Sequence, residues 1–401
     1  MLSLDDARAL LVSRVTPLPA VEVPLALGLG CRLAAAPEAD ADLPPSDLAA
    51  MDGYAARAED LAAGRPVPIA FVVPAGAASE PLHASAAVRI FTGAVVPPGA
   101  DTVVPQEEAE VLTDGRVRLP RLPPGSHMRR RGEIFAAGAV LAQVSESLNP
   151  ALLAVLAAGG VVTVKVIPRP RVAVLVTGAE FVHGSTVPAP GQVRDSNGPL
   201  LAALADQSRL EVSAPETVGD ELPALCGRLE AAAGKSDIVV TSGGVSVGDF
   251  DLVPRAVEEL GGEIVLHRVA IQPGKPILIA RLGETWLAGL PGNPVSALVG
   301  WRLFALPLAE TLAGDAAAFG ETPVPAVLTS PARNSSDRTQ LRPALLELRG
   351  GEWRVTMLPW KGSHDVLAAA SANALARLEG SSEIESGTSL PCFPLPWRWT
   401  G

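Results

Sequence analysis

The residues best suited to chemistry stand in the loop Thr241–Asp249, which follows an apolar run and precedes a helical pattern. Adjacent glycines let a backbone approach a ligand closely and turn its N–H groups toward an anion, and serine hydroxyls add donors. Carboxylates beside a bound phosphate indicate a divalent cation, for which Asp249 and Asp251 are the candidates. The alternative is a plain strand-to-helix turn. The candidate ligand-binding residues of this loop are Ser242, Gly243, Gly244, Ser246 and Gly248.

Two further loops have a similar character. Gln272–Pro276 places Lys275, one of only four lysines in the chain, beside a Pro-Gly turn, although a solvated turn tip has the same composition. Gly289–Ser296 contains Asn293 and Pro294, which suit the N-cap and the first position of a helix. Such a helix start would offer free backbone donors to an anion, and the alternative is a capped helix without a ligand.

The elements that must position these loops alternate between strands and helices. Continuous apolar runs at 171–178 and 237–241 are typical of strands buried on both faces. Alternation of strand and helix patterns over 169–310 predicts a mostly parallel sheet covered by helices on both sides. Ligands bind such sheets beyond the carboxyl ends of the strands, so we expect the three loops to face one common cleft. The further strands are expected near 209–218, 263–267, 276–281 and 285–289, and the helices at 199–204, 221–233, 252–260 and 294–308.

The rest of the chain reads mainly as short strands. Apolar runs broken by Pro and Gly predict a β-rich domain from about 44 to 134 and a second β-rich module after about 320. A helix is expected at 4–14 behind Ser3 as its N-cap, and another at 150–158. Residues 23–36 read as helical or irregular. The strings Met51–Ala55 and Phe91–Ala94 read as turns.

Composition limits the class of protein. The chain has 401 residues, 43 acidic against 32 basic groups and a net charge of −11, so a phosphate-tracking nucleic-acid surface is not expected. Three widely spaced cysteines argue against a disulfide framework or a zinc knuckle. The start of the sequence lacks the pattern of a signal peptide, and no apolar stretch suggests a membrane span. We therefore expect a cytoplasmic protein of several domains that binds neither nucleic acid nor membrane.

Taken together, these strings resemble the molybdopterin molybdenumtransferase family, the MoeA-type enzymes that include the C-terminal region of gephyrin. The resemblance implies four parts: a helical linking domain from 1–43 and 135–168, a β-rich domain at 44–134, a molybdopterin-binding, MogA-like α/β domain at 169–310, and a C-terminal β-barrel at 318–401. The matching strings are Met51–Ala55, Phe91–Ala94, Gly99–Val104, Thr241–Gly248, Pro273–Pro276, Gly289–Ser296 and Gly362–His364.

The resemblance also implies an activity and a set of site residues. Such enzymes convert adenylylated molybdopterin and molybdate, with Mg²⁺, to molybdenum cofactor and AMP. The resemblance further implies a homodimer with shared active sites. A MogA-like adenylyltransferase and apo-molybdoenzymes are the protein partners that it implies. The implied catalytic residues are Asp52, Thr92, Glu180, Asp220 and Asp251. The implied substrate-binding residues, besides those of the first loop, are Arg268, Lys275, Pro291, Gly292, Asn293, Pro294, Arg342 and Ser363.

The chain departs from the family pattern at four positions. Ile134 stands where the family usually has an aspartate, and Ala179 replaces the acid before Glu180. Arg268 and Gln272 stand where it usually has two lysines, so one positive charge is lost. The alternative to a transferase is therefore a catalytically weakened paralogue that binds or delivers the pterin cofactor. An anchoring scaffold like part of gephyrin has less support, because the sequence contains no extended linker.

Overall fold

The computed structural model describes residues 1–61, 64–182, 184–246 and 251–397 and divides into two compact units. The larger unit comprises Met1–Val21 and Ile167–Gly401, and the smaller unit comprises Glu22–Val166. Gly248 and Asp249, two of the predicted site residues, lie outside the described residues.

A seven-stranded sheet forms the centre of the larger unit, in the order β15-β12-β17-β21-β20-β18 with β16 also beside β12. The pairings among β15, β16, β12, β17 and β21 are parallel, as the sequence predicts, but β20 pairs antiparallel with both β21 and β18. The sheet is therefore mixed, because a tight turn at Gly283 joins β20 to β21 as a hairpin. The strands are β12 (Arg171–Thr177), β15 (Glu211–Val212), β16 (Glu216–Val218), β17 (Ile238–Ser242), β18 (Glu263–His267), β20 (Leu278–Leu282) and β21 (Thr285–Leu290).

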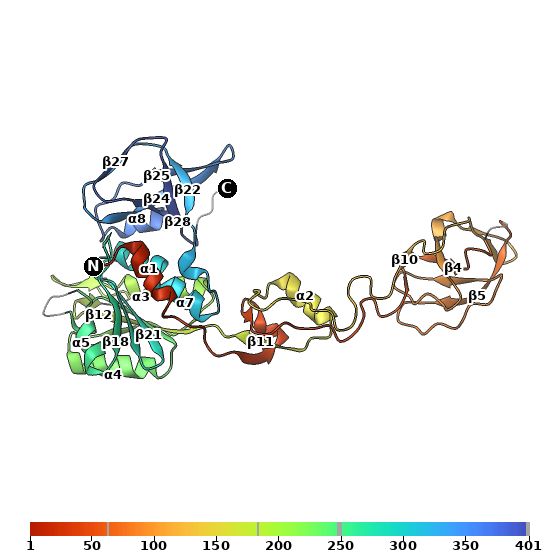
Figure 1. Ribbon diagram of the computed structural model, residues 1–401, viewed down its shortest axis with the longest axis horizontal. Helices are drawn as coiled ribbons and strands as arrows, with labels where there is room; N and C mark the ends of the chain where they lie inside the picture. Colours follow the sequence, from red (N-terminus) through yellow and green to blue (C-terminus); the bar gives the residue numbers. More distant parts are fainter. Residues whose placement is uncertain (62–63, 183, 247–250, 398–401) are drawn as a thin grey trace. The chain divides into compact units, whose positions relative to one another are not determined.

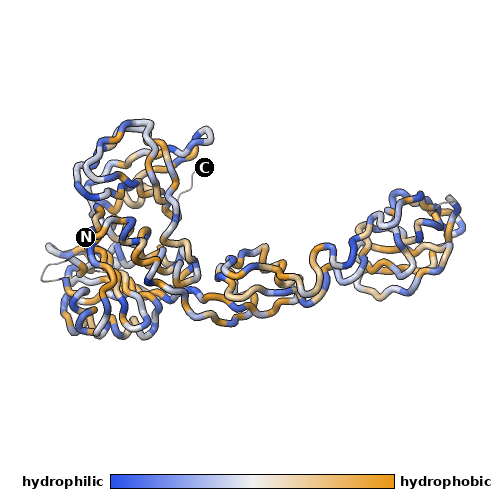
Figure 2. Tube along the Cα trace, in the orientation of Figure 1, coloured by the Kyte–Doolittle hydropathy of each residue, from blue (hydrophilic) through white to orange (hydrophobic). Residues whose placement is uncertain are grey.

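Helices cover both faces of this sheet (Figure 1). Successive side chains of a strand point to opposite faces, so Val172 and Val174 join one core and Ala173 and Leu175 the other. Figure 2 shows hydrophobic residues concentrated along these strands. The first core packs against α1 (Leu4–Val12), α3 (Asn197–Gln207), α6 (Pro294–Gly300), η3 (Trp301–Ala305) and α7 (Leu306–Leu312), and the second against α4 (Leu222–Ala233) and α5 (Leu252–Glu259).

Two segments of the larger unit differ from the sequence interpretation. The α1 helix has the predicted Ser3 N-cap, but its Leu4 and Leu11 are buried in the core of the larger unit, so this helix belongs to that unit and not to the linking segment. The run Pro294–Leu312 is long and apolar enough to cross a membrane by length and composition. Because 89% of it is buried inside the fold, its apolar character is that of a core helix.

The C-terminal part of the larger unit is a small closed barrel. Its strands pair in a circle, β24-β25-β22-β28-β26 and back to β24, around a core that includes Ala344, Leu346 and Val355. One strand from the α/β part, β19 (Ile271–Gln272), adds to β24 in parallel. The bounds are β22 (Val324–Leu328), β24 (Thr339–Arg349), β25 (Glu352–Met357), α8 (Val366–Ser371), β26 (Ala374–Leu378) and β28 (Ser389–Pro394), with the pair β23 (Ala332–Asn334) and β27 (Ser382–Ile384) beside them.

The smaller unit contains a six-stranded sheet in the order β7-β4-β6-β5-β9-β8. The prediction of a turn at Met51–Ala55 is wrong for its second half, because Gly53–Ala56 is the buried strand β4. A side chain at Gly53 would lie 1.9 Å from the carbonyl oxygen of Val104, so this position admits only glycine. The other strands are β5 (Val67–Val73), β6 (Ala87–Ile90), β7 (Thr102–Pro105), β8 (Glu110–Val111) and β9 (Arg116–Arg118), with η2 (Gln106–Glu108) after β7 and the pair β3 (Leu48–Ala49) and β10 (Met128–Arg129) beside them.

The remaining part of the smaller unit is less helical than predicted. A three-stranded sheet in the order β1-β11-β2 accompanies one α-helix, so the expected helical linking segment is built largely from strands. The alternating Val-rich residues of β11 explain this, because Val164 and Val166 point into one small core with Leu148 and Leu156. The elements are β1 (Val21–Pro24), η1 (Leu25–Gly28), β2 (Arg32–Leu33), α2 (Pro150–Ala158) and β11 (Thr163–Ile167).

Candidate functional site

The main candidate site is a cleft of about 670 Å³ beyond the carboxyl ends of β12, β17 and β21, which we call the strand-end cleft. A sheet of this kind binds ligands at this edge, because helix starts and strand ends leave backbone groups unpaired there. The predicted residues that line it are Glu180, Asp220, Gly243, Gly244, Gly292, Asn293 and Pro294. Residues that the sequence interpretation did not select also line it: Thr177, Gly178, Phe181, Val193, Arg194, Ser196, His364 and Val366.

The two adjacent glycines take left-handed backbone conformations, with φ of 93° at Gly243 and 65° at Gly244. A side chain at Gly243 would lie 2.7 Å from the carbonyl oxygen of Thr177. The Gly243 N–H donates to the carbonyl oxygen of Leu290 at 2.9 Å, so it is not free to bind an anion. The glycines therefore bring two strand ends together and give the cleft a backbone floor, rather than forming a complete anion nest.

Asn197 holds two of these loops in place. It is the first residue of α3 and is 2% exposed. Its side-chain Nδ2 donates to the Ser242 hydroxyl and to the Gly292 carbonyl oxygen, both at 2.7 Å. The predicted ligand role of Ser242 is not supported by its position, because this hydroxyl is buried and engaged by Asn197. In a sequence, an asparagine at a helix start indicates an N-cap, so the bonds of Asn197 to Ser242 and Gly292 could not be predicted.

The charged groups of the strand-end cleft are mixed. Glu180 and Asp220 contribute carboxylates, and one oxygen of Asp220 accepts the backbone N–H of Ala179 at 3.0 Å. Arg194, on β14 (Val193–Arg194) beside β13 (Phe181–Val182), contributes a cation. Among the described residues no three His, Cys, Asp or Glu side chains cluster as a ready metal site. Two carboxylates facing a phosphate suit Mg²⁺, which is commonly bound by one or two carboxylates and substrate phosphates.

A second recess, of about 410 Å³, adjoins the first and shares Asn293 and His364 with it. We call it the cationic pocket, because Lys275 and Arg338 line it and, within the part of the chain that the structure describes, none of its lining residues is Asp or Glu. Besides the shared Asn293, three predicted residues are in its wall: Lys275, Pro291 and Ser363. The remaining lining residues are Gln272, Pro273, Gly274, Pro276, Ser296, Trp360 and Gly362.

The three loops thus meet, but around two adjoining recesses rather than one cleft. Gly243 and Gly292 line the strand-end cleft, and Lys275 lines the cationic pocket. Asn293 stands at the N-cap of α6 as predicted, although its side chain makes no capping bond. The backbone N–H of Val295 donates to the carbonyl oxygen of Ser363 at 2.9 Å, so the barrel uses a donor of this helix start.

Five described residues among those predicted in the larger unit line neither recess: Ser242, which is buried, and Ser246, Asp251, Arg268 and Arg342. Ser246 is exposed, and Asp251 is half-buried at the N-cap position of α5. Arg268 takes a left-handed conformation between β18 and β19. Arg342 lies on β24, and its pKa is lowered because burial disfavours its charged form.

In the smaller unit, Asp52 and Thr92 form one cluster. Oδ1 of Asp52 accepts the Thr92 backbone N–H at 2.7 Å and the Thr92 hydroxyl at 2.8 Å, and these bonds hold the pKa of Asp52 below its usual value. Arg89 lies over the rings of Tyr54 and Phe91 at 5.1 and 5.0 Å and donates to the Gly53 carbonyl oxygen. The family resemblance named Asp52 and Thr92 as site residues, and the structure shows that they are hydrogen-bonded neighbours. The resemblance did not indicate Arg89.

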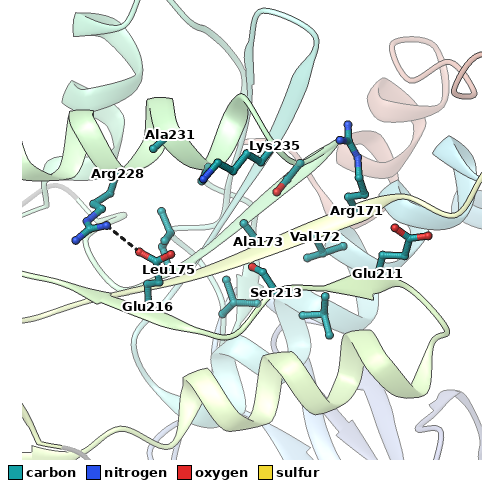
Figure 3. A pocket seen from close by; sticks show the side chains of 14 residues that line it. Arg171, Val172, Ala173, Leu175, Glu211, Ser213, Glu216, Arg228, Ala231 and Lys235 are labelled. Carbon is teal, nitrogen blue, oxygen red and sulfur yellow. Dashed lines mark hydrogen bonds and ion pairs between the residues drawn. The ribbon is translucent and has the colours of Figure 1, made fainter.

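A third cleft, of about 490 Å³, lies between α4 and the amino-terminal half of β12 (Figure 3). Its arginines are paired with carboxylates: Arg228 with Glu216 at 3.2 Å, and Arg171 with Asp237 at 2.8 Å. It contains none of the glycine-rich loops and lies away from the carboxyl ends of the strands. We therefore assign it no functional role.

The fold and the two recesses place the chain among multidomain α/β proteins whose candidate site lies beyond the carboxyl ends of the sheet strands. Three family models match the chain: the MoeA N-terminal region (domain I and II) at residues 2–160, a probable molybdopterin binding domain at 173–311, and the MoeA C-terminal region (domain IV) at 325–395. Molybdopterin molybdenumtransferase 2 of Mycobacterium tuberculosis is 35% identical over 395 residues, which cover 94% of this chain and 95% of that protein.

A molybdopterin molybdenumtransferase of Staphylococcus aureus is 33% identical over 378 residues, or 93% of this chain and 90% of that protein. The crystal structure of a molybdopterin biosynthesis MoeA protein from Pyrococcus horikoshii matches with a TM-score of 0.82 and 30% identity over the whole of both chains. The chain belongs to the molybdopterin molybdenumtransferase family, and it is an enzyme of molybdenum cofactor biosynthesis.

Proposed function

We propose that this chain inserts molybdenum from molybdate into adenylylated molybdopterin, with release of AMP. The observation that carries the proposal is the pair of adjoining recesses, one with carboxylates and a backbone floor and the other with cations and no acid. Molybdate is a doubly charged oxyanion that needs fixed donors and cations, which suits the cationic pocket. The phosphates of the adenylylated pterin suit the strand-end cleft beside it.

In this proposal the carboxylates of the strand-end cleft have a charge-neutralising role. Glu180 and Asp220 would hold Mg²⁺, which neutralises the phosphoanhydride when it is bound. Asp220 is oriented by the Ala179 N–H, and Arg194, which also lines the cleft, can bind a phosphate oxygen. Asp251 stands at the start of α5, where Val253 N–H donates to the Gly244 carbonyl oxygen, and so lies beside the same loop.

We further propose a cytoplasmic homodimer with shared active sites. Asp52 and Thr92 line neither recess of the larger unit, yet their hydrogen-bonded pair keeps Asp52 ionised at an accessible position. In a shared site this carboxylate would come from the second subunit. Mixing Asp52→Asn subunits with Asp220→Asn subunits, each inactive alone, regenerates activity only if the sites are shared.

The proposed activity is tested by incubating the purified chain with adenylylated molybdopterin, molybdate and Mg²⁺ and measuring AMP by chromatography. We expect AMP release that saturates with molybdate and yields a cofactor able to activate an apo-molybdoenzyme. A MogA-like adenylyltransferase can supply the substrate in a coupled assay. AMP formation no faster than in the absence of protein would refute the proposal.

Gln272 favours one second candidate, a paralogue that binds or delivers the pterin without catalysis. This neutral side chain lines the cationic pocket where the family usually has a lysine. Tight pterin binding without AMP release would favour this candidate. AMP release gained by Gln272→Lys would then identify the missing charge.

A further inference from the structure

Three buried polar atoms beside the cationic pocket have no partner among the described residues: Oε1 of Gln272, Oε1 of Gln340 and Nε of Arg342. They share one face of the barrel edge. Gln272 on β19 and Gln340 on β24 are partners across a parallel pairing, so their side chains point to the same side. Arg342 is two residues further along β24 and therefore points the same way.

Ile271 and Leu341 point to the opposite side of these strands, where both are fully buried in the core of the larger unit. Further along β24, Ala344 and Leu346 are on the same side as Gln340 and are buried in the core of the barrel. Gln272 and Arg338 line the cationic pocket, and Gln340 lies directly beside Gln272 across the strand pairing. Arg342 lines neither recess, but it follows next on this side of β24, so the three unpaired atoms lie between the pocket and the barrel core.

Unpaired atoms of this kind indicate a ligand. Most buried polar side-chain atoms in proteins have a hydrogen-bond partner, and one without a partner destabilises the fold. Arg342 adds a charge that burial disfavours, which lowers its pKa, and it makes no ion pair among the described residues. An anion would satisfy this guanidinium. The two amides can serve the same anion, because a half-turn of the terminal amide exchanges its oxygen for its NH₂ group.

We propose that Gln340, together with Gln272, is a specificity-determining pair that donates amide hydrogen bonds to the oxyanion held by Arg342 and Lys275. The inference rests on the proposed function and adds Gln340, a residue with no assigned role, to the molybdate site. At positions 272 and 340 neutral amide groups would supply directed hydrogen-bond donors in place of positive charges. They suit a tetrahedral oxyanion, whose oxygens accept from several directions at once.

The test compares Gln340→Glu and Gln340→Leu with the wild type. A glutamate at 340 can pair with Arg342, so it should leave the melting temperature unchanged or raise it, while its charge repels an oxyanion. We expect the affinity for molybdate, titrated calorimetrically, to fall about 100-fold in Gln340→Glu and about 10-fold in Gln340→Leu. The KM for molybdate in AMP release should rise by the same factors, with the KM for the adenylylated pterin unchanged. Gln143→Glu, on the exposed surface of the smaller unit, is the charge-matched control.

The outcomes separate the two proposals. If the wild type releases AMP but Gln340→Glu keeps the molybdate affinity and KM of the wild type, the amide pair is refuted and the transferase activity stands. If molybdate binding depends on Gln340 but no AMP is released, the activity is refuted and the oxyanion site stands. If the wild type binds no molybdate at all, the amide pair is refuted.

Discussion

The two adjoining recesses of the larger unit are built in different ways. The strand-end cleft is formed mainly by the backbone of short loops, with Gly243 and Gly292 bringing strand ends together and two carboxylates at its wall. The cationic pocket is formed mainly by side chains, with Lys275 and Arg338 and no acid in its wall. They meet at Asn293 and His364.

In the proposed reaction, this difference would give the adenylylated pterin and the oxyanion separate surroundings. A phosphate ester with a divalent cation tolerates nearby carboxylates, because the cation offsets their charge. A free oxyanion does not, and it needs donors and cations alone. Separation lets the chain hold both ligands next to each other without placing the carboxylates against the oxyanion. Substitutions in one recess should therefore leave ligand binding in the other nearly unchanged.

The largest effect is expected for Gly243→Ala. The new methyl group would lie 2.7 Å from the Thr177 carbonyl oxygen at a φ of 93°, so the loop must move. A displacement of about 1 Å near the reacting groups can cost about 100-fold in rate, which we expect in kcat/KM for the adenylylated pterin. The KM for molybdate should change little. Gly283→Ala, at a φ of 59° in open space, is the matched control for backbone strain and should keep full activity. Equal losses in both variants would contradict the assignment.

A smaller effect, on the KM for molybdate and not on the KM for the pterin, is expected for Lys275→Met. Loss of one charge-assisted hydrogen bond should raise the KM for molybdate about 10- to 100-fold, because such a bond contributes about 1.5–3 kcal/mol. The KM for the pterin should remain as in the wild type, which steady-state kinetics with each substrate varied will show. Lys235→Met removes an exposed lysine from the third cleft and should alter neither value. A pterin KM that rises as much as the molybdate KM would show that the two recesses are one site.

The smallest functional effect is expected for Asp237→Asn, at the opposite end of β17 from both recesses. Burial acts to raise the pKa of Asp237, but hydrogen bonds from the Arg171 side chain and backbone outweigh it and hold that pKa below 3.8. The carboxylate therefore stabilises the fold at pH values above 3.8, and this contribution is lost as the pH falls through the lowered pKa.

We expect the variant to lose about 2 kcal/mol of unfolding free energy at pH 7 in urea denaturation, and to converge with the wild type as the pH falls through the lowered pKa of Asp237. Both KM values should be unchanged. A difference in stability that does not shrink as the pH falls below 3.8 would exclude ionisation of Asp237 as its source.

Much of the fold could be predicted from periodicity. The strands β12 and β17 are continuous apolar runs, and α4 and α5 have clear helical spacing, so their positions agree with the sequence interpretation. The sequence interpretation missed β4 because Gly53, at the start of this strand, is typical of a turn. β4 is a strand because it is buried and paired between β6 and β7. β20 was placed correctly, but its antiparallel direction depends on the turn at Gly283.

The candidate site was only partly predictable. Glycines and prolines in loops after strands are visible in a sequence because few other residues fit such backbones. Asn197 and Gln340 were invisible, because an amide side chain is common at helix starts and on strands, and its role depends on what lies opposite. Ser242 was selected for its type, yet the fold turns its hydroxyl toward Asn197.

The sequence by itself determined most strands and helices of the α/β part and several positions where the backbone needs glycine, because these depend mainly on contacts within a few residues. It also determined the family, through an ordered set of short motifs. Only the tertiary structure decided that the loops divide between two recesses of different charge, and that β19 joins the barrel and aligns Gln272 with Gln340. Such neighbours are far apart along the chain, and they meet through the packing of distant elements.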